Sequence, residues 1–505
     1  MKDKIIFWLG NDYTHFCIAH ALQKRYDSDI YGICEVTERP KKFFQNQALV
    51  NFEKIWLFHD HIEKTTEEPN YEYLKNFEEK YEIDLWKLVQ NERIFLYYRN
   101  FYKFSPNEIL KILEQECRFF ENVLTEIKPD FFFTKTSSLH HQELFIQMCQ
   151  KMGVKVQILT YSPLGKHCIL FQNTSKLDYT DNLENVNDQG RDFNLLQNYL
   201  KEFDLVQQLD KKILSPGSGT LESLKAAKEF FLHADSKNIK THYTYYGRSK
   251  LKVFLYHLNE SIKTKNRGDY VNKYLKKDLK YSEPFVYFPL HTEIERSLLI
   301  SAPYYTNQIE MIKSIAKSLP INFKLFVKEH PAQVKRAWRD ISEYKEVSNI
   351  PNVVMVHPNV PNEILYKNCS LLITIAGTPG FEASFYGKPV ITMTDMYYSL
   401  LPSVNTVKNL EELPTLIKEG LKQKIEPNNL DRFLSILEKN ISKFDYADFM
   451  AELSNDFFYG GNLVDVTISE TKMKAFLERN DPKLQIIAED HIKKIKWFNE
   501  SKIKK

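Results

Sequence analysis

The sequence predicts an α/β protein with two parallel-sheet domains, a helical segment between them and further helices at the C-terminal end. Short continuous apolar runs, such as residues 5–9 and 371–374, are typical of strands buried on both faces. These runs alternate with segments of helical periodicity in two separate arrays. Because consecutive parallel strands need a crossover, the alternation indicates two sheets with right-handed strand–helix–strand connections.

The first array covers residues 1–170 and predicts an N-terminal Rossmann-like domain. Polar turns such as Gly10-Asn11-Asp12 separate its apolar and helical segments. We expect strands at residues 5–9, 30–36, 55–58, 94–97, 129–133 and 154–159, and helices at residues 15–26, 107–127 and 143–151.

The second array covers residues 283–425 and predicts a second Rossmann-like domain. Its strands are expected at residues 284–288, 323–327, 353–356, 371–374 and 389–392. Residues 171–282 between the arrays are polar and less regular, with helical patterns near 194–209 and 220–232, so they predict a helical connection. Residues 426–505 are mostly helical in pattern, and we expect them to pack back across the domains.

The overall composition excludes several classes of protein. Hydrophobic residues at 43% and charged residues at 27% are ordinary for a globular domain, and a net charge of +3 does not indicate a nucleic-acid partner. The first strand begins too early for a signal peptide, and no window reaches the roughly 18 apolar residues of a spanning helix. Six widely spaced cysteines, with no Cys-x-x-Cys pair, indicate reduced thiols. We therefore expect a cytoplasmic protein.

The C-terminal tail is basic and contains apolar insertions. Residues 491–498 are followed by Lys502, Lys504 and Lys505. Such a segment could touch anionic lipid at the inner face of the cell membrane, where a lipid-linked acceptor would lie. The alternative is a solvated helix end.

Two polar loops in the second array predict a phosphate site. One follows the strand at 323–327, the other follows the strand at 371–374 and opens a helix, and ligands collect at such carboxyl ends of parallel strands. Glycine lets backbone approach a phosphate, and a cationic Lys/His loop offsets its charge. The candidate residues are Lys328, His330, Pro331, Thr374, Gly377, Thr378, Gly380 and Glu382.

Each candidate also has a purely structural interpretation. His330-Pro331 could be a solvated turn, the glycines could serve only the turn, and Thr378 could cap the helix that follows. Glu382 lies one helical turn after Thr378 and could simply pair with the helix dipole.

A general base for an acceptor hydroxyl is sought at the strand ends of the first domain. Asp12 follows the first strand, although Asp is also a favoured helix N-cap. Asp60, after a later strand, is the rival candidate, and His140, His141 and Glu143 remain alternatives. Because alternate side chains of an extended His59-Asp60-His61 point to opposite faces, we expect no metal site there.

Three stretches of the second half resemble the bacterial capsule polysaccharide biosynthesis family. They are residues 285–291, residues 326–331, and residues 377–383 with the Gly387-Lys388-Pro389-Val390 turn that follows. Members of this family are GT-B glycosyltransferases and include transferases of 3-deoxy-manno-octulosonic acid (Kdo). The His330-Pro331 pair also resembles the motif with which GT-B sialyltransferases contact the phosphate of a CMP-sugar.

The resemblance covers about 140 residues. It implies a GT-B fold whose two domains face a cleft, in which the first domain binds the acceptor and the second binds the nucleotide-sugar donor. It implies a metal-independent glycosyltransferase without a cofactor, and a Glu382 that accepts the ribose hydroxyls. The donor would be a CMP-sugar by preference or a UDP-sugar, and the acceptor a surface polysaccharide or glycolipid. The alternatives are a sugar-nucleotide 2-epimerase, a CDP-polyol phosphotransferase and a non-catalytic glycan-binding module.

Overall fold

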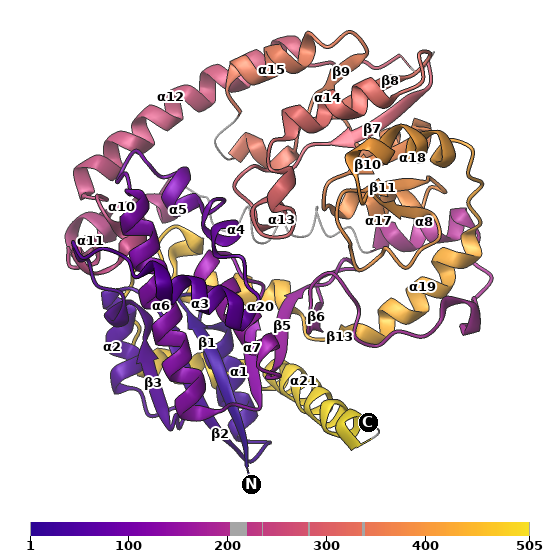
Figure 1. Ribbon diagram of the computed structural model, residues 1–505. Helices are drawn as coiled ribbons and strands as arrows, with labels where there is room; N and C mark the ends of the chain where they lie inside the picture. Colours follow the sequence, from indigo (N-terminus) through magenta and orange to yellow (C-terminus); the bar gives the residue numbers. More distant parts are fainter. Residues whose placement is uncertain (1, 203–219, 235, 281–282, 336–338, 504–505) are drawn as a thin grey trace. The chain divides into compact units, whose positions relative to one another are not determined.

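The computed structural model describes residues 2–202, 220–234, 236–280, 283–335 and 339–503, which fold into two compact units with one sheet each (Figure 1). Unit 1 contains Met1–Asn173, Phe203–Lys252 and Asn440–Lys505. Unit 2 contains Thr174–Glu202 and Val253–Lys439. Part of the helix expected at 194–209 lies outside the described residues; the part inside them is α8 (Phe193–Glu202).

The sheet of unit 1 has the strand order β13-β6-β5-β4-β1-β2-β3. Strands β1 to β5 pair in parallel, while β6 and β13 add two antiparallel strands at one edge. The direction in which strands are added reverses between β1 and β4, which is the doubly wound order. The strands are β1 (Asp3–Gly10), β2 (Ser28–Glu35), β3 (Lys54–Leu57), β4 (Phe131–Lys135), β5 (Lys155–Tyr161), β6 (Cys168–Phe171) and β13 (Ile441–Ser442).

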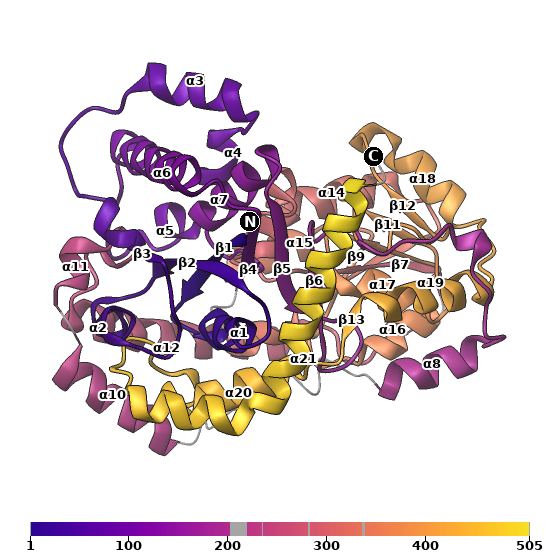
Figure 2. The same cartoon turned by 90° about the horizontal axis from the view of Figure 1, so that it is seen from below.

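Helices cover both faces of this sheet (Figure 2). One face is covered by α1 (Thr14–Gln23), α2 (Glu38–Asn46) and α20 (Tyr446–Phe457), and the other by α3 (Tyr71–Tyr81), α6 (Pro106–Ile127) and α7 (His140–Lys151). The boundary of α6 follows from its sequence, since Ser105 and Glu108 form a reciprocal capping box in front of the apolar stripe. The parallel-sheet prediction for this part of the chain is confirmed.

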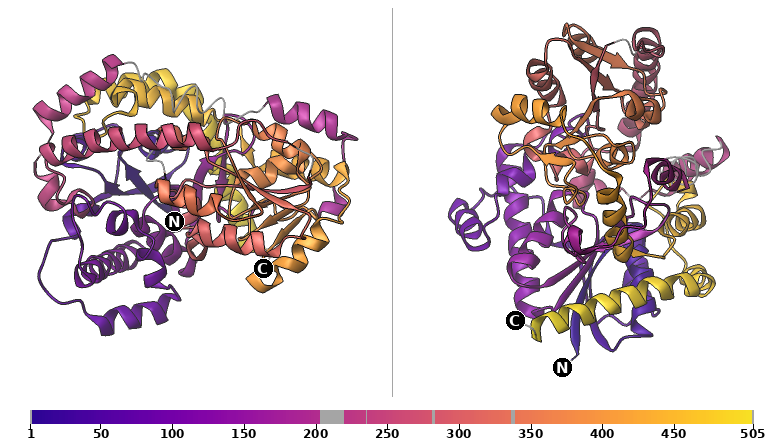
Figure 3. Two further views of the ribbon diagram at one scale, coloured as in Figure 1. Left: turned by 90° about the horizontal axis from the view of Figure 1, so that it is seen from above. Right: turned by 90° about the vertical axis from the view of Figure 1, so that its right-hand side faces the viewer.

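The C-terminal helix α21 (Glu470–Ile503) belongs to unit 1 and packs on α1 (Figure 3). His491 Nδ1 lies 2.7 Å from Gln157 Oε1, and Lys494 Nζ donates to the carbonyl of Leu170. Ile495 and Phe498 are buried in the core of unit 1. The side chains that suggested a lipid contact for the tail are therefore largely used inside the unit, and residues 504–505 lie outside the described chain.

The sheet of unit 2 has the order β12-β11-β10-β7-β8-β9, and all its strands are parallel. This is the Rossmann order, with its reversal between β7 and β10. The strands are β7 (Phe285–Pro289), β8 (Lys324–Lys328), β9 (Val353–Val356), β10 (Leu371–Thr374), β11 (Val390–Thr392) and β12 (Val404–Thr406). The helices next to them are α14 (Gln308–Ser318), α15 (Ile341–Ser348), α16 (Asn362–Asn368), α17 (Thr378–Ser384) and α18 (Leu413–Gly420). The prediction of two Rossmann-like sheets is confirmed.

Several segments differ from the sequence prediction, and two of them are helices in places where the sequence predicted a strand or no element. The strand expected at 94–97 is wrong, because residues 94–96 lie in the short helix α5 (Arg93–Leu96), and the Glu92 carboxylate accepts from the Ile94 amide at its start. The connection also contains a 25-residue helix, α12 (Lys250–Tyr274), that the sequence pattern did not predict. The helix expected at 220–232 is confirmed as α10 (Thr220–His233).

Among the helices that the structure describes, none is both long enough and apolar enough to cross a membrane.

We expect Phe498→Ala to lower the free energy of unfolding by about 3–5 kcal/mol, the usual cost of removing a buried phenylalanine. Phe498 is 3% exposed, and its ring centroid lies 6.1 Å from that of Phe131. Urea denaturation followed by tryptophan fluorescence measures the change, with the exposed Lys496→Ala as control. Equal stability of the two variants would contradict the packing described for α21.

Candidate active site

Both sheets place polar residues at the point where the strand order reverses. In unit 1 this point lies at the carboxyl ends of β1 and β4, and in unit 2 at those of β7 and β10. Helices leave such neighbouring strands toward opposite faces, so a crevice opens at the strand ends and admits ligands. The two points are described separately below.

In unit 2, the glycines of the loop after β10 are required by close packing. A Cβ on Gly377 would lie 2.8 Å from His291 Cε1 and 2.9 Å from Thr374 Oγ1. A Cβ on Gly380 would collide with the ring of Tyr398, whose hydroxyl donates to the Gly377 carbonyl over 2.6 Å. The backbone φ of Gly377 is −125°, so space rather than backbone conformation selects glycine there.

His291, which follows β7, lies at the centre of this loop cluster and was not among the site residues predicted from sequence. Its Nε2 accepts from the Ala376 amide over 3.4 Å and lies 3.3 Å from Thr374 Oγ1. Burial, with the nearby His330 and Arg339 side chains, lowers the pKa of His291 to about 3. His291 is therefore a neutral imidazole that joins the carboxyl ends of β7 and β10.

His330 follows β8 in a loop that the buried Glu329 fixes. The Glu329 carboxylate accepts from the His330 amide over 2.6 Å, from Tyr344 Oη over 2.6 Å and from Arg339 Nε over 3.1 Å. His330 Nδ1 accepts from the Ala332 amide over 3.1 Å. A neutral His330 therefore has its proton on Nε2, which is the donor that a contact to phosphate needs.

A second His-Pro pair in the same sheet shows what is generic about this turn. His357-Pro358 follows β9, and His357 Nδ1 accepts from the Asn359 amide over 3.1 Å. His330 Nδ1 accepts in the same way from the amide two residues after it, that of Ala332. The dipeptide alone therefore produces this hydrogen bond. What distinguishes His330 is its strand, since β8 is next to the reversal point and β9 is the edge of the sheet.

Lys328 and Glu382 belong to a polar cluster beneath these loops. Lys328 is only 3% exposed, its Nζ donates to Asn362 Oδ1, and burial lowers its pKa to about 8 although Glu382 opposes the shift. Glu382 accepts from the Tyr366 hydroxyl over 2.7 Å. Pro331 and Thr378, by contrast, are exposed at the loop tips.

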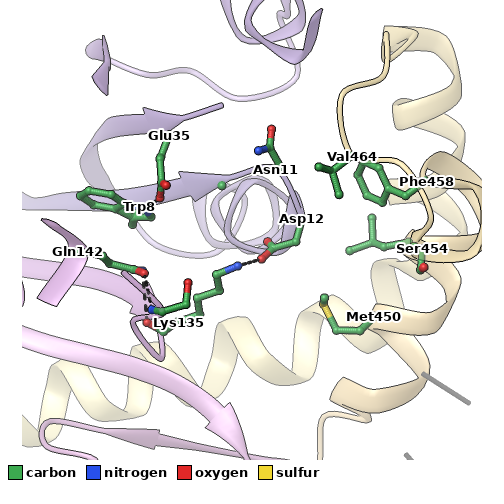
Figure 4. Close-up of a pocket in the computed structure, with 14 residues that line it drawn as sticks. Trp8, Asn11, Asp12, Glu35, Lys135, Gln142, Met450, Ser454, Phe458 and Val464 are labelled. Atoms are coloured by element: carbon green, nitrogen blue, oxygen red, sulfur yellow. Dashed lines mark hydrogen bonds and ion pairs between the residues drawn. The ribbon is translucent and has the colours of Figure 1, made fainter. Parts of the chain in front are cut away.

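In unit 1, the reversal point forms a pocket of about 300 Å³. Strand ends contribute Trp8, Asn11, Asp12, Glu35 and Lys135, while α20 and the segment after it contribute apolar side chains (Figure 4). Figure 4 shows Asp12 and Lys135 pointing toward one another across the pocket. Carboxylate, amide, ammonium and aromatic groups around one hollow suit a polar, hydroxyl-bearing ligand.

Asp12 accepts hydrogen bonds at the start of α1 and lines the pocket. One oxygen accepts from the Thr14 amide over 3.1 Å at the start of α1, and the other accepts from Lys135 Nζ. Burial raises the pKa of Asp12, but the Lys135 ammonium outweighs burial, so the pKa lies below its usual value. Asp12 is thus an ionised carboxylate at neutral pH.

Glu35, the last residue of β2, is a second carboxylate in the pocket that the sequence analysis missed. Its Oε2 accepts from Trp8 Nε1 over 3.0 Å, and its Oε1 lies 3.0 Å from His141 Nε2. Burial raises the pKa of Glu35, but His141 outweighs it and the pKa is lowered. The sequence did contain a signal for Glu35, because Glu35 ends a strand that neighbours the first strand of the sheet.

Behind Glu35 a buried polar network extends into the unit. His141 Nδ1 lies 2.7 Å from the hydroxyl of Tyr243, which donates to Glu116 over 3.0 Å. His140 lies between Glu116 and Glu92, 3.0 Å from each; burial lowers its pKa, but the two carboxylates raise it to about 10.

The spacing of this network also bears on metal binding. Among the described residues, ligand atoms of Glu116, His140 and His141 lie within 4.8 Å of one another, a spacing that would admit a cation. Each of these side chains already has a protein partner at hydrogen-bond distance. We therefore interpret the group as a hydrogen-bonded network.

The remaining candidates for the base lie elsewhere. Asp60, in the 3-10 helix η1 (Phe58–His61), has a side chain that is 44% exposed and lies 2.6 Å from Lys41 Nζ, and it does not line the pocket. Glu143 on α7 accepts from the Ser137 hydroxyl.

Residues 191–412 match the family described as "Capsule polysaccharide biosynthesis protein". No curated protein matches the sequence. Similar solved structures include a Methanocaldococcus jannaschii UDP-GlcNAc 2-epimerase in complex with UDP-GlcNAc and UDP, at 15% identity, covering 86% of this chain and 99% of that one with a TM-score of 0.25. The Thermosulfurimonas dismutans KpsC beta Kdo 2,7 transferase is similar at 13% identity, covering 71% and 97% with a TM-score of 0.29.

The matched segment contains every strand of the unit 2 sheet, together with the loops of His291, His330 and Gly377. Two Rossmann-like domains in one chain are the composition of the GT-B fold. Residues 191–412 are thus similar to the capsule polysaccharide biosynthesis family, whose model they match.

Proposed function

We propose that the protein is a glycosyltransferase that moves a sugar from a nucleotide-activated donor onto a saccharide acceptor in surface polysaccharide synthesis. The observation that supports this most directly is the meeting of His291, Thr374 and Gly377 at the reversal point of unit 2, next to the loop of His330. This cluster lies within the segment that matches the capsule family. It supplies imidazole, hydroxyl and backbone groups suited to phosphate oxygens.

In the proposed reaction, an acceptor hydroxyl attacks the anomeric carbon of the donor sugar. A new C–O bond forms, and the bond between that carbon and the nucleotide phosphate oxygen breaks. The phosphate leaves with the bonding electron pair, so a donor at His330 Nε2 stabilises the charge that develops on it. The hydroxyl proton passes to a carboxylate base, and the products are a glycoside and the free nucleotide.

The donor is proposed to be a CMP-sugar, with a UDP-sugar as second choice. The His330-Pro331 turn supports this through its resemblance to the phosphate contact of CMP-sugar transferases. Thermal unfolding with CMP, CDP, UDP or GDP tests the nucleotide, since a ligand at 100 times its Kd stabilises by about 2.7 kcal/mol. Stabilisation by none of the four would overturn the proposed donor site.

The alternative enzyme classes are separated by their products. A 2-epimerase would convert UDP-GlcNAc without any acceptor. A CDP-polyol phosphotransferase would release CMP and form a phosphodiester bond in its product. A glycosyltransferase instead forms a glycosidic bond, which phosphodiesterases do not cleave.

The acceptor is proposed to bind in the pocket of unit 1, with Glu35 as the base. Asp12 and Glu35 are both ionised carboxylates there, but Asp12 faces Lys135, an ammonium whose pKa is raised by Asp12 against the effect of burial. Glu35 instead lies 3.0 Å from His141 Nε2, and His141 Nδ1 lies 2.7 Å from the Tyr243 hydroxyl, so a polar network continues behind Glu35.

His330→Ala is expected to lower turnover by roughly 10²–10³-fold, the usual loss for one transition-state donor. Single-turnover release of nucleotide from the donor measures the change. The variant must first be shown to unfold at the same temperature as the wild type.

The matched control for that variant is His357→Asn, which alters the other His-Pro turn of the same sheet. We expect this control to retain activity, because β9 lies away from the reversal point. Equal losses in both variants would show that His330 acts only through the fold.

Glu35→Gln is expected to lower transfer by roughly 10²–10⁴-fold, as loss of a general base does. Asp12→Asn should cost less, since Asn still caps α1. Because the pKa of Glu35 lies below its usual value, wild-type activity should fall only as the pH drops through that lowered pKa. A pH–rate profile of the wild type measures this dependence, and transfer rates of the two variants compare the two carboxylates. An inactive Asp12→Asn beside an active Glu35→Gln would return the base to Asp12.

A further inference from the structure

Arg339 connects the two loops of unit 2 that carry His291 and His330. It lies just before α15 and is 5% exposed, so its charge is buried. Its Nε donates to Glu329 over 3.1 Å, its Nη1 donates to Glu293, and its Nη2 donates to the carbonyl of His291. One side chain therefore holds the loop after β7 by two acceptors and the loop after β8 by a third.

The Glu329 carboxylate extends this connection to His330. Glu329 accepts from the His330 amide and from the Tyr344 hydroxyl, each over 2.6 Å, in addition to Arg339. The Glu329 side chain is fully buried, and a buried carboxylate depends on such donors. Without the guanidinium, the carboxylate that fixes the His330 amide would itself lose a partner.

On the other loop, Arg339 acts on the backbone of His291. The His291 carbonyl accepts from Arg339 Nη2 and, over 3.0 Å, from Gln308 Nε2. The His291 amide donates to Gln308 Oε1 over 2.7 Å. These bonds fix the residue whose ring Nε2 lies 3.3 Å from Thr374 Oγ1 at the reversal point. Arg339 thus holds one imidazole residue directly and the other through a single carboxylate.

The arrangement suits a guanidinium and no other cationic side chain. Arginine carries N–H donors on three nitrogens in one plane, and each of these nitrogens in Arg339 serves a different acceptor. A lysine ammonium is a point charge without this planar fork. Burying an ion pair gains little net stability, because desolvation of both charges offsets their attraction. The geometry that the pair fixes is therefore its main contribution.

We propose that Arg339 is a positioning residue of the donor site, which holds the loops of His291 and His330 at the spacing that lets both imidazoles contact one donor phosphate. This inference rests on the proposed glycosyltransferase function. Arg339 acts without touching the phosphate, since its three nitrogens already donate within the protein. Groups held in place before the ligand binds need no rearrangement during the reaction.

Coupling between Arg339 and His330 tests the proposal. Arg339→Met is expected to lower turnover about 10²-fold, as displacement of a reacting group by about 1 Å does. In a His330→Ala background the same substitution should cost less than about tenfold, because residues that act together have non-additive effects. Arg339→Lys should stay close to Arg339→Met, since it returns the charge without the fork. Equal losses in both backgrounds, or full activity of Arg339→Lys, would overturn the proposal.

The matched control is Arg191→Met, which breaks another arginine–carboxylate pair of unit 2. Arg191 Nε donates to the fully buried Asp431 on α19 (Pro427–Asn440), a helix that follows the last strand of the sheet. We expect this variant to unfold at a lower temperature than the wild type and to keep its turnover. A loss of turnover as large as that of Arg339→Met would show that Arg339 acts only through stability.

The NMR signals of the histidine rings provide a measurement that needs no substrate. In the ligand-free wild type, the Ala332 amide donates to His330 Nδ1, so a neutral His330 carries its proton on Nε2. Isotope-labelled histidine reports this tautomer, and His330→Ala identifies the signal. We expect Arg339→Met to mix the second tautomer into the signal and Arg191→Met to leave it unchanged.

Tyr344→Phe provides a second variant in case Arg339→Met does not fold. It removes a neutral donor to Glu329 and keeps the charge of the cluster and nearly all of the side-chain volume. We expect it to change the His330 signal in the same direction as Arg339→Met. A His330 signal that neither variant changes would overturn the proposal.

The two measurements separate this inference from the proposed function. A wild type that transfers no sugar, but whose His330 signal responds to Arg339→Met, would reject the transferase and retain the positioning role. Normal transfer by Arg339→Met with an unchanged His330 signal would reject the positioning role alone.

Discussion

The reversal of strand order within each parallel sheet is the constraint on which both candidate sites depend. Between β1 and β4, and between β7 and β10, crossover helices leave toward opposite faces, so the strand ends stay open. Asp12 and His291 are the polar residues that follow β1 and β7, and each is fixed by a partner from the strand across the reversal: Lys135 for Asp12, and Thr374 for His291. A register slip of one residue would separate both pairs.

Much of this arrangement was predictable from sequence, because buried parallel strands have a strong apolar signal. The strand at Leu371–Thr374 was predicted to the residue, and so was the polar loop behind it. Prediction failed where the local pattern was ambiguous or absent. The apolar run at 94–97 is as short as a strand, and the cap from Glu92 that opens the helix lies outside the run. The helix α12 was not predicted, although apolar residues recur along it at helical spacing.

The sites themselves were predictable only in part, since pairing across the fold is not visible along the chain. Lys328 looked like a phosphate ligand because it follows a strand, yet it is nearly buried and held by Asn362. Glu35 ends its strand and was overlooked, because its significance depends on His141 more than a hundred residues later. Burying several ionisable groups is costly unless each has partners, and the network behind Glu35 meets that requirement.

The division of unit 1 along the chain affects how the protein is made. Its edge strand β13 and the helices α20 and α21 come from beyond residue 440, after the whole of unit 2. During synthesis, unit 2 can therefore complete its core first, while the earlier-made N-terminal strands lack the helix that covers α1. Unit 1 contains the first residues to be synthesised but is completed by the last. Its N-terminal part is therefore exposed for longest on the ribosome, and we expect chaperones to bind there before the chain is released.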